Sequence, residues 1–288
     1  MQGLPLRSTA GSSPIGAAGR AVLYIVLFII AVVQLFPIYW LLTFSLKSNQ
    51  QIFSSHPLSF PLQPKWENYE KVWSAGNIGT YFLNSLWITV VATLLTVVIA
   101  SFATYAITRM NWKLSKLALG MIMVAMMIPV HSTLIPLYSM FNFAHLIDHP
   151  LSIIISYIAF NLPITVLIML GFYYTIPREI EEAAVMDGSS IHRLVLTIIF
   201  PMTGTVVATT GIVNMIYNWN EFIFVNTFIS SNELKTLTVG VQNFIGQYTT
   251  DWGAIGATLM ISILPILIAF IFLSDRIVEG LAAGSIKG

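Results

Sequence analysis

Long runs of apolar residues constrain this chain more than any other feature of its sequence. Six runs approach or exceed the roughly 20 residues that an α-helix needs to cross a bilayer. Their bounds are Ala21–Phe44, Tyr81–Thr108, Leu117–Phe141, Leu151–Thr175, Thr203–Phe228 and Trp252–Ser274. Charged residues make up 9% of the 288 residues, whereas soluble domains carry about a quarter. The sequence therefore predicts an all-α integral membrane protein in which residues 21–274 form one six-span domain.

The positive charges predict the side of the membrane on which each loop lies. Six spans put both termini on one side. Nine Lys and Arg residues fall on that side, namely Arg7, Arg20, Arg109, Lys113, Lys116, Arg178, Arg193, Arg276 and Lys287, and four on the other, Lys47, Lys65, Lys71 and Lys235. Cytoplasmic loops carry an excess of Lys and Arg, so we expect both termini in the cytoplasm. Residues 1–20, rich in Gly, Ser, Ala and Pro, are predicted to be a disordered tail, and residues 275–288 a second, flexible tail.

A short acidic stretch separates the fourth and fifth apolar runs. Its pattern predicts an amphipathic helix over Arg178–Asp187, followed by Gly188, which suits the left-handed position that ends a helix. Ser189 or Ser190 is then placed to cap a second helix over Ile191–Phe200, and Pro201 restricts the backbone of Phe200 before it. By spacing alone, this is either a charged surface loop or a helix-turn-helix that another protein approaches closely.

The same stretch resembles the loop signature of permease subunits of ABC importers. That signature is Glu-Ala-Ala, then Gly after three residues, then a hydrophobic residue and Pro. Here it reads Glu182-Ala183-Ala184, Asp187-Gly188 and Phe200-Pro201, with Phe where the family usually has Leu. The resemblance implies a type I importer permease fold and a cytoplasmic coupling loop at about residues 176–202. It also implies that the ATPase docks on six residues, Glu182, Ala183, Ala184, Asp187, Gly188 and Ser189.

A second stretch is the most polar one inside a predicted span. It reads Asn-Met-Ile-Tyr-Asn-Trp-Asn-Glu from Asn214 to Glu221, and such side chains are costly to expose to lipid. Its Trp219–Phe222 core is similar to a segment common in sugar-type importer permeases. We predict a substrate pathway lined by Asn161, Asn214, Tyr217, Asn218, Trp219, Asn220 and Glu221. The alternative is an outer-interface position, with Trp219 in an aromatic belt and Glu221 in water.

Small and kinking residues predict how the spans pack. Ala92, Thr96, Ala100 and Thr104 recur at every fourth position, which favours close helix–helix contact in lipid. Three prolines at positions 129, 136 and 163 interrupt helical hydrogen bonding within predicted spans. Such interruptions are tolerated where protein or water covers the freed carbonyls, and they also occur along transport pathways.

No motif for catalysis is found in the chain. It has no G-x-S-x-G, H-E-x-x-H or P-loop sequence and no cysteine, so it is not predicted to be an enzyme. His145 and His149 are the sole histidines spaced like metal ligands, and no metal site or bound cofactor is predicted. A net charge of +1 gives no reason to expect a nucleic-acid partner.

Taken together, the chain is identified as a permease subunit of a carbohydrate ABC importer in the bacterial cytoplasmic (inner) membrane. The Gly-rich end from Gly280 is also similar to that of the maltose-type second permease. The resemblance implies three kinds of partner in addition to the lipid bilayer: a different second permease, two copies of a cytoplasmic ATPase that binds Mg-ATP, and an extracytoplasmic sugar-binding protein. The alternatives are an importer of a non-sugar solute, an ion-coupled secondary transporter, or a membrane-embedded enzyme.

Overall fold

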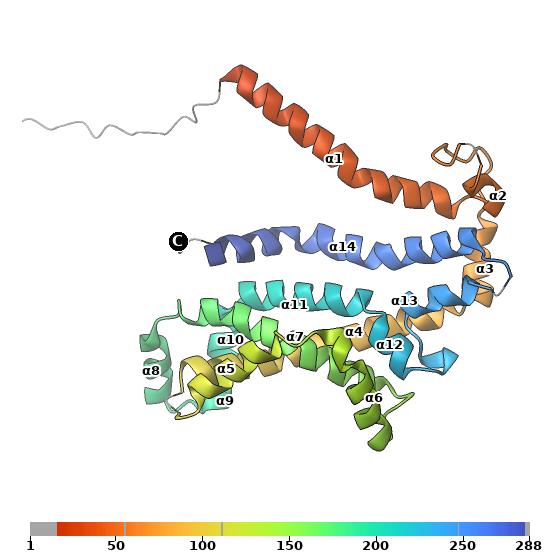
Figure 1. Ribbon diagram of the computed structural model, residues 1–288. Coiled ribbons are helices and arrows are strands. Elements are labelled where there is room, and N and C mark those ends of the chain that lie inside the picture. The colour runs from red at the N-terminus through yellow and green to blue at the C-terminus, as the bar shows by residue number, and fades with distance from the viewer. Residues whose placement is uncertain (1–15, 55, 111, 247, 286–288) are drawn as a thin grey trace, which may run out of the picture.

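The computed structural model describes residues 16–285 except for residues 55, 111 and 247. Apart from one antiparallel bridge between Ile245 and Thr250, the described residues form helices, turns and loops. The long helices run side by side, so that the bundle has two ends (Figure 1). We name them the α8 end and the α13 end, after a short helix at each.

Four helices are long and apolar enough to cross a membrane. They are α1 (Ala17–Ser45), α4 (Ile78–Thr108), α7 (Pro150–Tyr173) and α14 (Trp252–Ser285). Three agree with the predicted runs within a few residues, but α14 is eleven residues longer, since it ends at Ser285 and not at Ser274. The tail predicted from residue 275 is therefore helical to Ser285, because its Leu-Ala-Ala segment favours helix. The helix α1 likewise begins at Ala17, inside the tail predicted for residues 1–20, and residues 1–15 lie outside the described part.

The predicted third span, Leu117–Phe141, is not one helix. It consists of α5 (Ser115–Ala125), the 3-10 turn η1 (Val130–Thr133) and α6 (Leu134–Phe143), and the two arms meet at 96°. Pro129 has an extended backbone, with ψ of 122°, which ends the first arm. Pro136 falls in the first turn of α6, where no intrahelical partner exists for its missing N–H. Two of the three predicted interruptions thus define one elbow.

The predicted fifth span, Thr203–Phe228, is also divided. It consists of α11 (Gly204–Asn220) and α12 (Ile223–Phe228), and Glu221 between them is extended, with ψ of 133°. The segment before it, residues 191–202, meets α11 at 84°. Counting each of the two bent pairs as one span gives six, the predicted number. By contrast, Pro163 does not interrupt α7, which continues through it.

The closest-packed helices are α4 and α7, which share the most extensive contact in the bundle. The predicted stripe of small residues is confirmed as a packing face, since Ala92, Thr96, Ala100 and Thr104 are all fully buried. Within it, the Thr96 hydroxyl donates to the Ala92 carbonyl at 2.7 Å, so its polar group is satisfied inside α4. The helix α11 packs on both α4 and α7 and completes the core.

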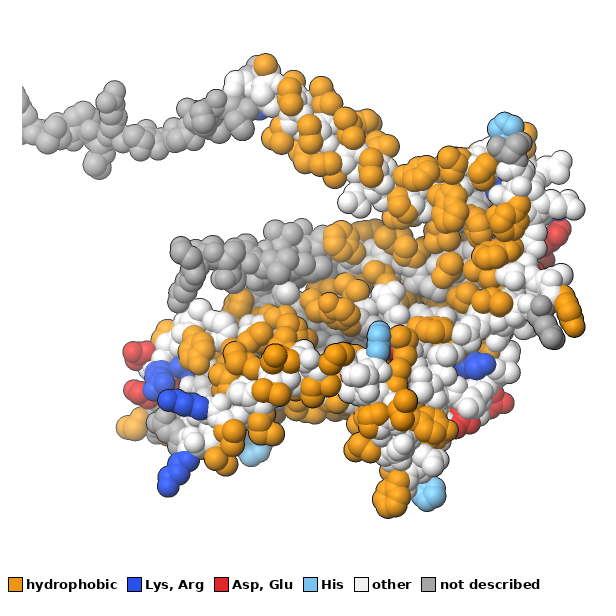
Figure 2. Space-filling view, in the orientation of Figure 1, with side chains coloured by type: hydrophobic (Ala, Val, Ile, Leu, Met, Phe, Trp, Pro, Cys, Tyr) orange, Lys and Arg blue, Asp and Glu red, His pale blue; other side chains and the backbone are white. Residues whose placement is uncertain are grey.

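In contrast, α1 is exposed along most of its length. It meets α14 near its C-terminal end, where a Cβ built on Gly256 would lie 2.5 Å from Phe44. Further toward its N-terminus α1 stands away from the bundle (Figure 1). Large apolar side chains there are exposed; those of Tyr24 and Phe28, for example, are 69% and 70% exposed. Figure 2 shows hydrophobic side chains along α1 and the middle of the bundle, and charged side chains gathered at its two ends.

Short elements close the α13 end. They are α2 (Asn49–Ile52), α3 (Glu67–Ala75), the 3-10 turn η3 (Asn232–Leu234), α13 (Leu237–Gly240) and the 3-10 turn η4 (Val241–Phe244). A Cβ on Gly240 would lie 2.3 Å from the Tyr81 ring, so glycine is required for α13 to sit on α4. The N-terminal start of α1 and the C-terminal end of α14 both lie toward the α8 end (Figure 1).

Candidate functional site: a projecting helix and a polar core

The acidic stretch forms α8 (Arg178–Met186), which projects from one end of the bundle (Figure 1). Glu179 and Glu181 fall in its first turn, where carboxylates are favourable beside the helix N-terminus. Asp187 is the C-cap residue, and Gly188 has φ of +78°. The predicted helix and the predicted left-handed glycine are therefore confirmed.

A serine cap follows that glycine, as predicted, and Ser190 supplies it. Its hydroxyl accepts a hydrogen bond from the Arg193 amide at 3.4 Å. The next helix is not regular. It runs as α9 (Ile191–Arg193), a π-helical turn (Leu194–Ile199) and α10 (Phe200–Met202). Pro201 has no N–H and its ring clashes with the carbonyl four residues earlier, which accounts for the widened turn before it. The helical segment thus ends at Met202, two residues beyond the predicted end at Phe200.

The outward face of α8 mixes acidic and apolar side chains. Met186 is 87% exposed and Val185 59% exposed, and Glu182, Ala183, Asp187 and Gly188 are exposed beside them. Ser189 is half-buried. Ala184, in contrast, is 6% exposed and packs into the chain's own core, so it is the one predicted docking residue that faces inward. Exposed apolar groups flanked by charges are typical of a protein-binding surface.

Arg109 joins α8 to the bundle, a contact that the sequence did not predict. Its Nε lies 3.1 Å from Glu181 Oε1, and both side chains are nearly covered, at 6% and 12% exposed. Its Nη2 also donates to the carbonyl oxygens of Tyr173 and Ile176, the latter at 2.7 Å. Beside this junction lies an open cavity of about 510 Å³ lined by Arg109, Arg178, Glu181, Glu182, Val185, Met186 and Tyr105. A single Arg at the end of a 31-residue apolar helix was the signal available in the sequence.

Three of the predicted pathway amides meet between α4, α7 and α11. Asn161 Nδ2 donates to Asn218 Oδ1 at 2.7 Å, and Asn218 Nδ2 donates to Thr93 Oγ1 at 3.2 Å. One turn away, Asn214 Nδ2 donates to Thr165 Oγ1 at 3.0 Å. Asn214 and Asn218 are 1% and 4% exposed. These amides therefore find hydrogen-bond partners in one another or in threonine hydroxyls of the same chain, as buried polar groups must in lipid.

Glu221 acts at the break between α11 and α12. Its Oε1 accepts a hydrogen bond from the Phe224 amide at 2.8 Å, so it caps the first turn of α12 from the position before the N-cap residue Phe222. Its Oε2 lies 3.3 Å from the Tyr157 hydroxyl, which donates to it. This capping is the physical reason that the apolar run is interrupted here. Glu221 is half-buried and is not in open water, contrary to the interface alternative.

Trp219 is buried in packing between helices. It is 3% exposed, and its indole Nε1 donates to the Ser262 carbonyl of α14 at 3.0 Å. Its ring meets Phe82 of α4 edge-on, with centroids 5.7 Å apart. The aromatic-belt alternative is therefore wrong, and Trp219 does not line an open path within this chain. In the sequence it was grouped with its polar neighbours, but its place on α11 turns it toward α14.

Tyr217 and Asn220 face away from the chain's own core. Tyr217 is 63% exposed, Asn220 is exposed, and Asn220 Nδ2 donates to the Ile216 carbonyl at 2.8 Å. The seven predicted pathway residues thus divide. Asn161, Asn214 and Asn218 are hydrogen-bonded to one another or to threonines, and Glu221 bonds separately to Tyr157 and the first turn of α12. Trp219 packs on α14, and Tyr217 and Asn220 are open to a neighbour or to water.

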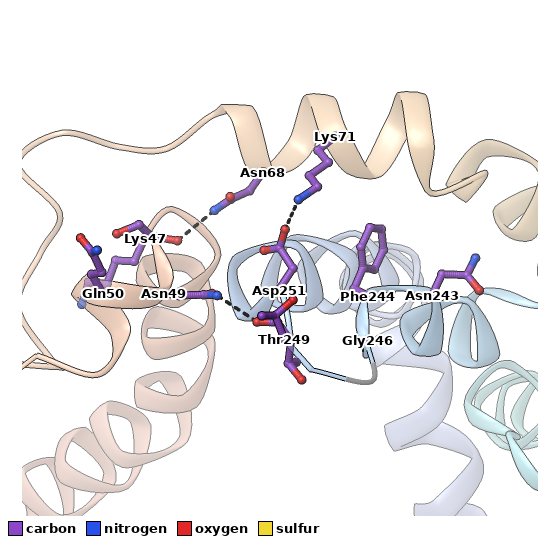
Figure 3. Close-up of a pocket in the computed structure, with 12 residues that line it drawn as sticks. Lys47, Asn49, Gln50, Asn68, Lys71, Asn243, Phe244, Gly246, Thr249 and Asp251 are labelled. Atoms are coloured by element: carbon purple, nitrogen blue, oxygen red, sulfur yellow. Dashed lines mark hydrogen bonds and ion pairs between the residues drawn. The ribbon is translucent and has the colours of Figure 1, made fainter.

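A polar recess of about 540 Å³ lies at the α13 end (Figure 3). Asn49 Nδ2 donates to the Thr250 carbonyl at 2.9 Å, and Asn68 Nδ2 donates to the Lys47 carbonyl at 3.0 Å. Lys71 pairs with Asp251 across it. Burial raises the pKa of Asp251, but the hydrogen bond from Lys71, the hydrogen bond from the Ala254 amide and the positive charge of Lys71 together outweigh this and leave that pKa below its ordinary value.

Asp148 ties two loops together near the same end. Its Oδ1 accepts hydrogen bonds from the Ser230 and Ser231 amides at 2.9 and 2.8 Å, and the Ser231 hydroxyl donates to its other oxygen. The Ser231 hydroxyl is the main reason that the pKa of Asp148 lies below its ordinary value. Of the two histidines considered as metal ligands, His149 instead caps α7, since its Nδ1 accepts from the Leu151 amide at 3.2 Å.

Residues 92–284 match the family described as "Binding-protein-dependent transport system inner membrane component". The chain belongs to this family. The resemblance seen in the Glu182 motif is thereby confirmed. The match includes α8, the buried asparagines of α7 and α11, and nearly all of α14.

Two curated proteins and one solved structure illustrate the relationship. A protein of a Caldicellulosiruptor species, named as an ABC transporter permease protein, is 38% identical over 252 residues, which cover 88% of this chain and 91% of that protein. The melibiose/raffinose/stachyose import permease protein MelC of Bacillus subtilis is 32% identical over 262 residues, covering 90% and 94%. The crystal structure of a bacterial ABC transporter involved in the import of alginate superposes with a TM-score of 0.78 at 20% identity, covering 90% and 98%. The last shows a common fold.

Membership fixes the general role of the chain. It is the membrane permease component of an ABC importer, and ATP is hydrolysed by a separate subunit. A binding-protein-dependent system also includes a binding protein, so this permease works with both partners. The rival assignments as an ion-coupled secondary transporter or a membrane enzyme are thereby excluded.

Proposed function

We propose that this permease imports a sugar or an oligosaccharide and that α8 and Gly188 form the site on which the ATPase docks. The observation that carries the docking part is the outward face of α8, where Val185 and Met186 are exposed between Glu182 and Asp187 at the charged end of the bundle. Exposing the apolar side chains of Val185 and Met186 to water raises the free energy, and their burial against a partner protein removes this cost. The Mg-ATP is bound by that partner, and this chain binds no cofactor.

The orientation follows from the same proposal. The ATPase is cytoplasmic, so the α8 end, with the start of α1 and the end of α14, lies in the cytoplasm, as the excess of Lys and Arg supports. The α13 end then faces outward, where the recess lined by Asn49, Lys71 and Asp251 (Figure 3) offers hydrogen bonds and charge to the binding protein.

A second, different permease subunit completes the membrane part in this proposal. The support is that α1 stands away from its own bundle with large apolar side chains exposed on every side. The outward pair on α11, Tyr217 and Asn220, supports the same view, because an amide open to lipid is costly. We propose that the substrate passes between the two permeases along this face of α11.

The proposal that the substrate is a sugar is supported by the relatives and by the side chains on the exposed face of α11. MelC is named for import of melibiose, raffinose and stachyose. An aromatic ring beside an amide suits a sugar, because the ring packs on C–H groups and the amide hydrogen-bonds hydroxyls. Tyr217 and Asn220 present that combination, whereas Asn161, Asn214 and Asn218 are already engaged with one another or with threonines.

We therefore expect Tyr217→Ala and Asn220→Ala to slow uptake by about tenfold each, with little loss of stability, since both side chains are exposed. The matched control is Ile216→Ala, which removes a 39% exposed apolar side chain from the same turn and should change uptake by less than about twofold. The measurement is the initial rate of sugar uptake per assembled complex. Equal effects at all three positions would show that this face is not the path.

The substrate class is tested with the complete transporter. The permease is reconstituted with its second permease and ATPase in vesicles, the binding protein is added outside, and ATP-dependent uptake of mono- and oligosaccharides is compared with that of amino acids and peptides. Uptake of at least one sugar, absent without ATP or without the binding protein, is the expected result. Uptake restricted to a non-sugar solute would overturn the sugar assignment and leave the importer assignment intact.

A further inference from the structure

Arg109 occupies the point where three elements meet at the α8 end. It follows the last residue of α4, donates to the carbonyls of Tyr173 in α7 and Ile176 just beyond it, and pairs with Glu181 in the first turn of α8. One guanidinium therefore holds the ends of two spanning helices and the start of the projecting helix. Its Nη2 donates to the two carbonyls, whereas its Nε faces Glu181 Oε1 as an ion pair without a hydrogen bond. A lysine ammonium, which carries its charge at one point, matches acceptors spread in this way poorly.

The burial of this junction makes it a firm connection. The Arg109 side chain is 6% exposed and that of Glu181 is 12% exposed, so solvent screens the pair weakly. The positive charge lies at the C-terminal end of α7, and the negative charge lies in the first turn of α8. Both positions are favoured by the helix dipoles. Removing Arg109 leaves the nearly buried Glu181 carboxylate without its ion-pair partner, whereas removing Glu181 leaves Arg109 with its two carbonyl acceptors.

The rest of α8 is loosely held. Ala184 packs inward, whereas Glu182, Val185, Met186 and Asp187 are all exposed. The Arg109–Glu181 ion pair joins α8 to a spanning helix, whereas the Lys71–Asp251 pair lies at the far end of the bundle. Arg109 thus provides the ionic contact that holds α8 to a spanning helix, while the outer face of α8 is exposed.

Through Arg109, α8 is connected to the helices that hold the buried amides of α11. The helices α4 and α7, which Arg109 holds together, carry Thr93, Asn161 and Thr165, the partners of the α11 amides. These two helices share the most extensive contact in the bundle, so a displacement of α8 would reach, through Arg109, the helices that hold α11.

We propose that Arg109 is a positioning residue that fixes α8 to the α4–α7 pair, so that motion imposed on α8 moves the membrane helices. This inference rests on the proposed docking of the ATPase on α8. It predicts a specific defect: without Arg109, the ATPase still hydrolyses ATP, but fewer substrate molecules are imported per ATP hydrolysed.

The first experiment measures the number of substrate molecules imported per ATP hydrolysed in the reconstituted complex. We expect Arg109→Gln to lower this ratio by about tenfold and Glu181→Gln to lower it less, because the bonds to the Tyr173 and Ile176 carbonyls remain. The double variant should be no worse than Arg109→Gln, since the two side chains act through one interaction. Arg109→Lys should recover part of the ratio, because the charge is kept but the fork is lost.

The matched control is Lys113→Gln, which removes an exposed positive charge a few residues further along and should leave the ratio within about twofold. An Arg109→Gln complex with the wild-type ratio, or strictly additive effects in the double variant, would overturn the proposal. Should the wild-type complex import no sugar, the proposed substrate fails, and the ratio is measured instead with the solute that it does import.

A second measurement needs neither substrate nor ATPase. The chain contains no cysteine, so spin labels can be placed at Val185→Cys on α8 and Leu151→Cys at the opposite end of α7, both exposed. The distance distribution between them should be narrow in the otherwise native permease and broad with Arg109→Gln. An unchanged distribution in that variant would overturn the proposal even where the variant loses its ATPase.

Discussion

Gly188→Val should weaken retention of the ATPase by about 5- to 30-fold, the equivalent of 1–2 kcal/mol. Gly188 has φ of +78°, a region that β-branched residues avoid. A Cβ added there would meet no atom within 4 Å, so the effect comes from backbone conformation and not from a clash. The strain is relieved if the turn opens, which moves Glu182, Val185 and Met186 away from their docking positions. The measurement is the ATPase that co-purifies with the permease over a range of concentrations.

The matched control for this prediction is Gly188→Asn. Asparagine adopts the left-handed conformation far more readily than valine does, yet it adds a side chain of similar size to the same exposed position. We expect its ATPase retention to stay within about twofold of the native value. Equal loss with Asn and with Val would mean that partner contact at this position, and not the turn, sets the affinity. Normal retention with both would mean that α8 is a solvated loop.

Trp219→Ala should lower the stability of the permease by about 3 kcal/mol, the lower end of the range for a buried tryptophan. The lower end applies because lipid replaces part of the apolar environment, while the packing contacts are lost. The ring is 3% exposed, meets Phe82, and donates to the Ser262 carbonyl. The variant should therefore show reduced membrane levels and earlier thermal unfolding in detergent, with near-native uptake per complex that remains folded.

Trp219→Phe separates the two contributions of the side chain. It keeps an aromatic ring beside Phe82 but removes the donor to Ser262, and a single lost hydrogen bond costs about 1 kcal/mol. We expect a smaller shift in thermal unfolding than for Trp219→Ala. A Trp219→Phe complex of native stability that imports sugar at a strongly reduced rate would contradict the packing role and return Trp219 to the pathway.

The parts predicted well from sequence depend on local chemistry. Apolar runs must become helices in lipid because no water satisfies their backbone groups, and this holds for α1, α4, α7 and α14. The left-handed turn at Gly188 was equally predictable, since glycine has no Cβ to clash there. The division of Leu117–Phe141 was signalled by Pro129 and Pro136, although the 96° bend between its arms was not.

The interior of the polar stretch was not predictable at the level of single residues. Asn218 and Asn220 are two positions apart and chemically identical, yet Asn218 bonds to Asn161 and Asn220 is exposed. Trp219 between them faces α14. Sequence showed that polar groups had to be satisfied here, but not which helix each would meet, because that depends on the rotation of α11 against its neighbours.

The sequence alone determined the membrane class, the helical fold, the helix of α8 with its glycine turn, and the family of the chain. These follow from composition, local backbone preferences and a spaced motif. The tertiary structure decided which carboxylate of the Glu181–Glu182 pair faces inward, because only Glu181 comes within 3.1 Å of Arg109. It also decided the pairing of the buried amides. These contacts join residues some 50 to 125 positions apart, and such pairs are selected by the packing of whole helices, which no local pattern encodes.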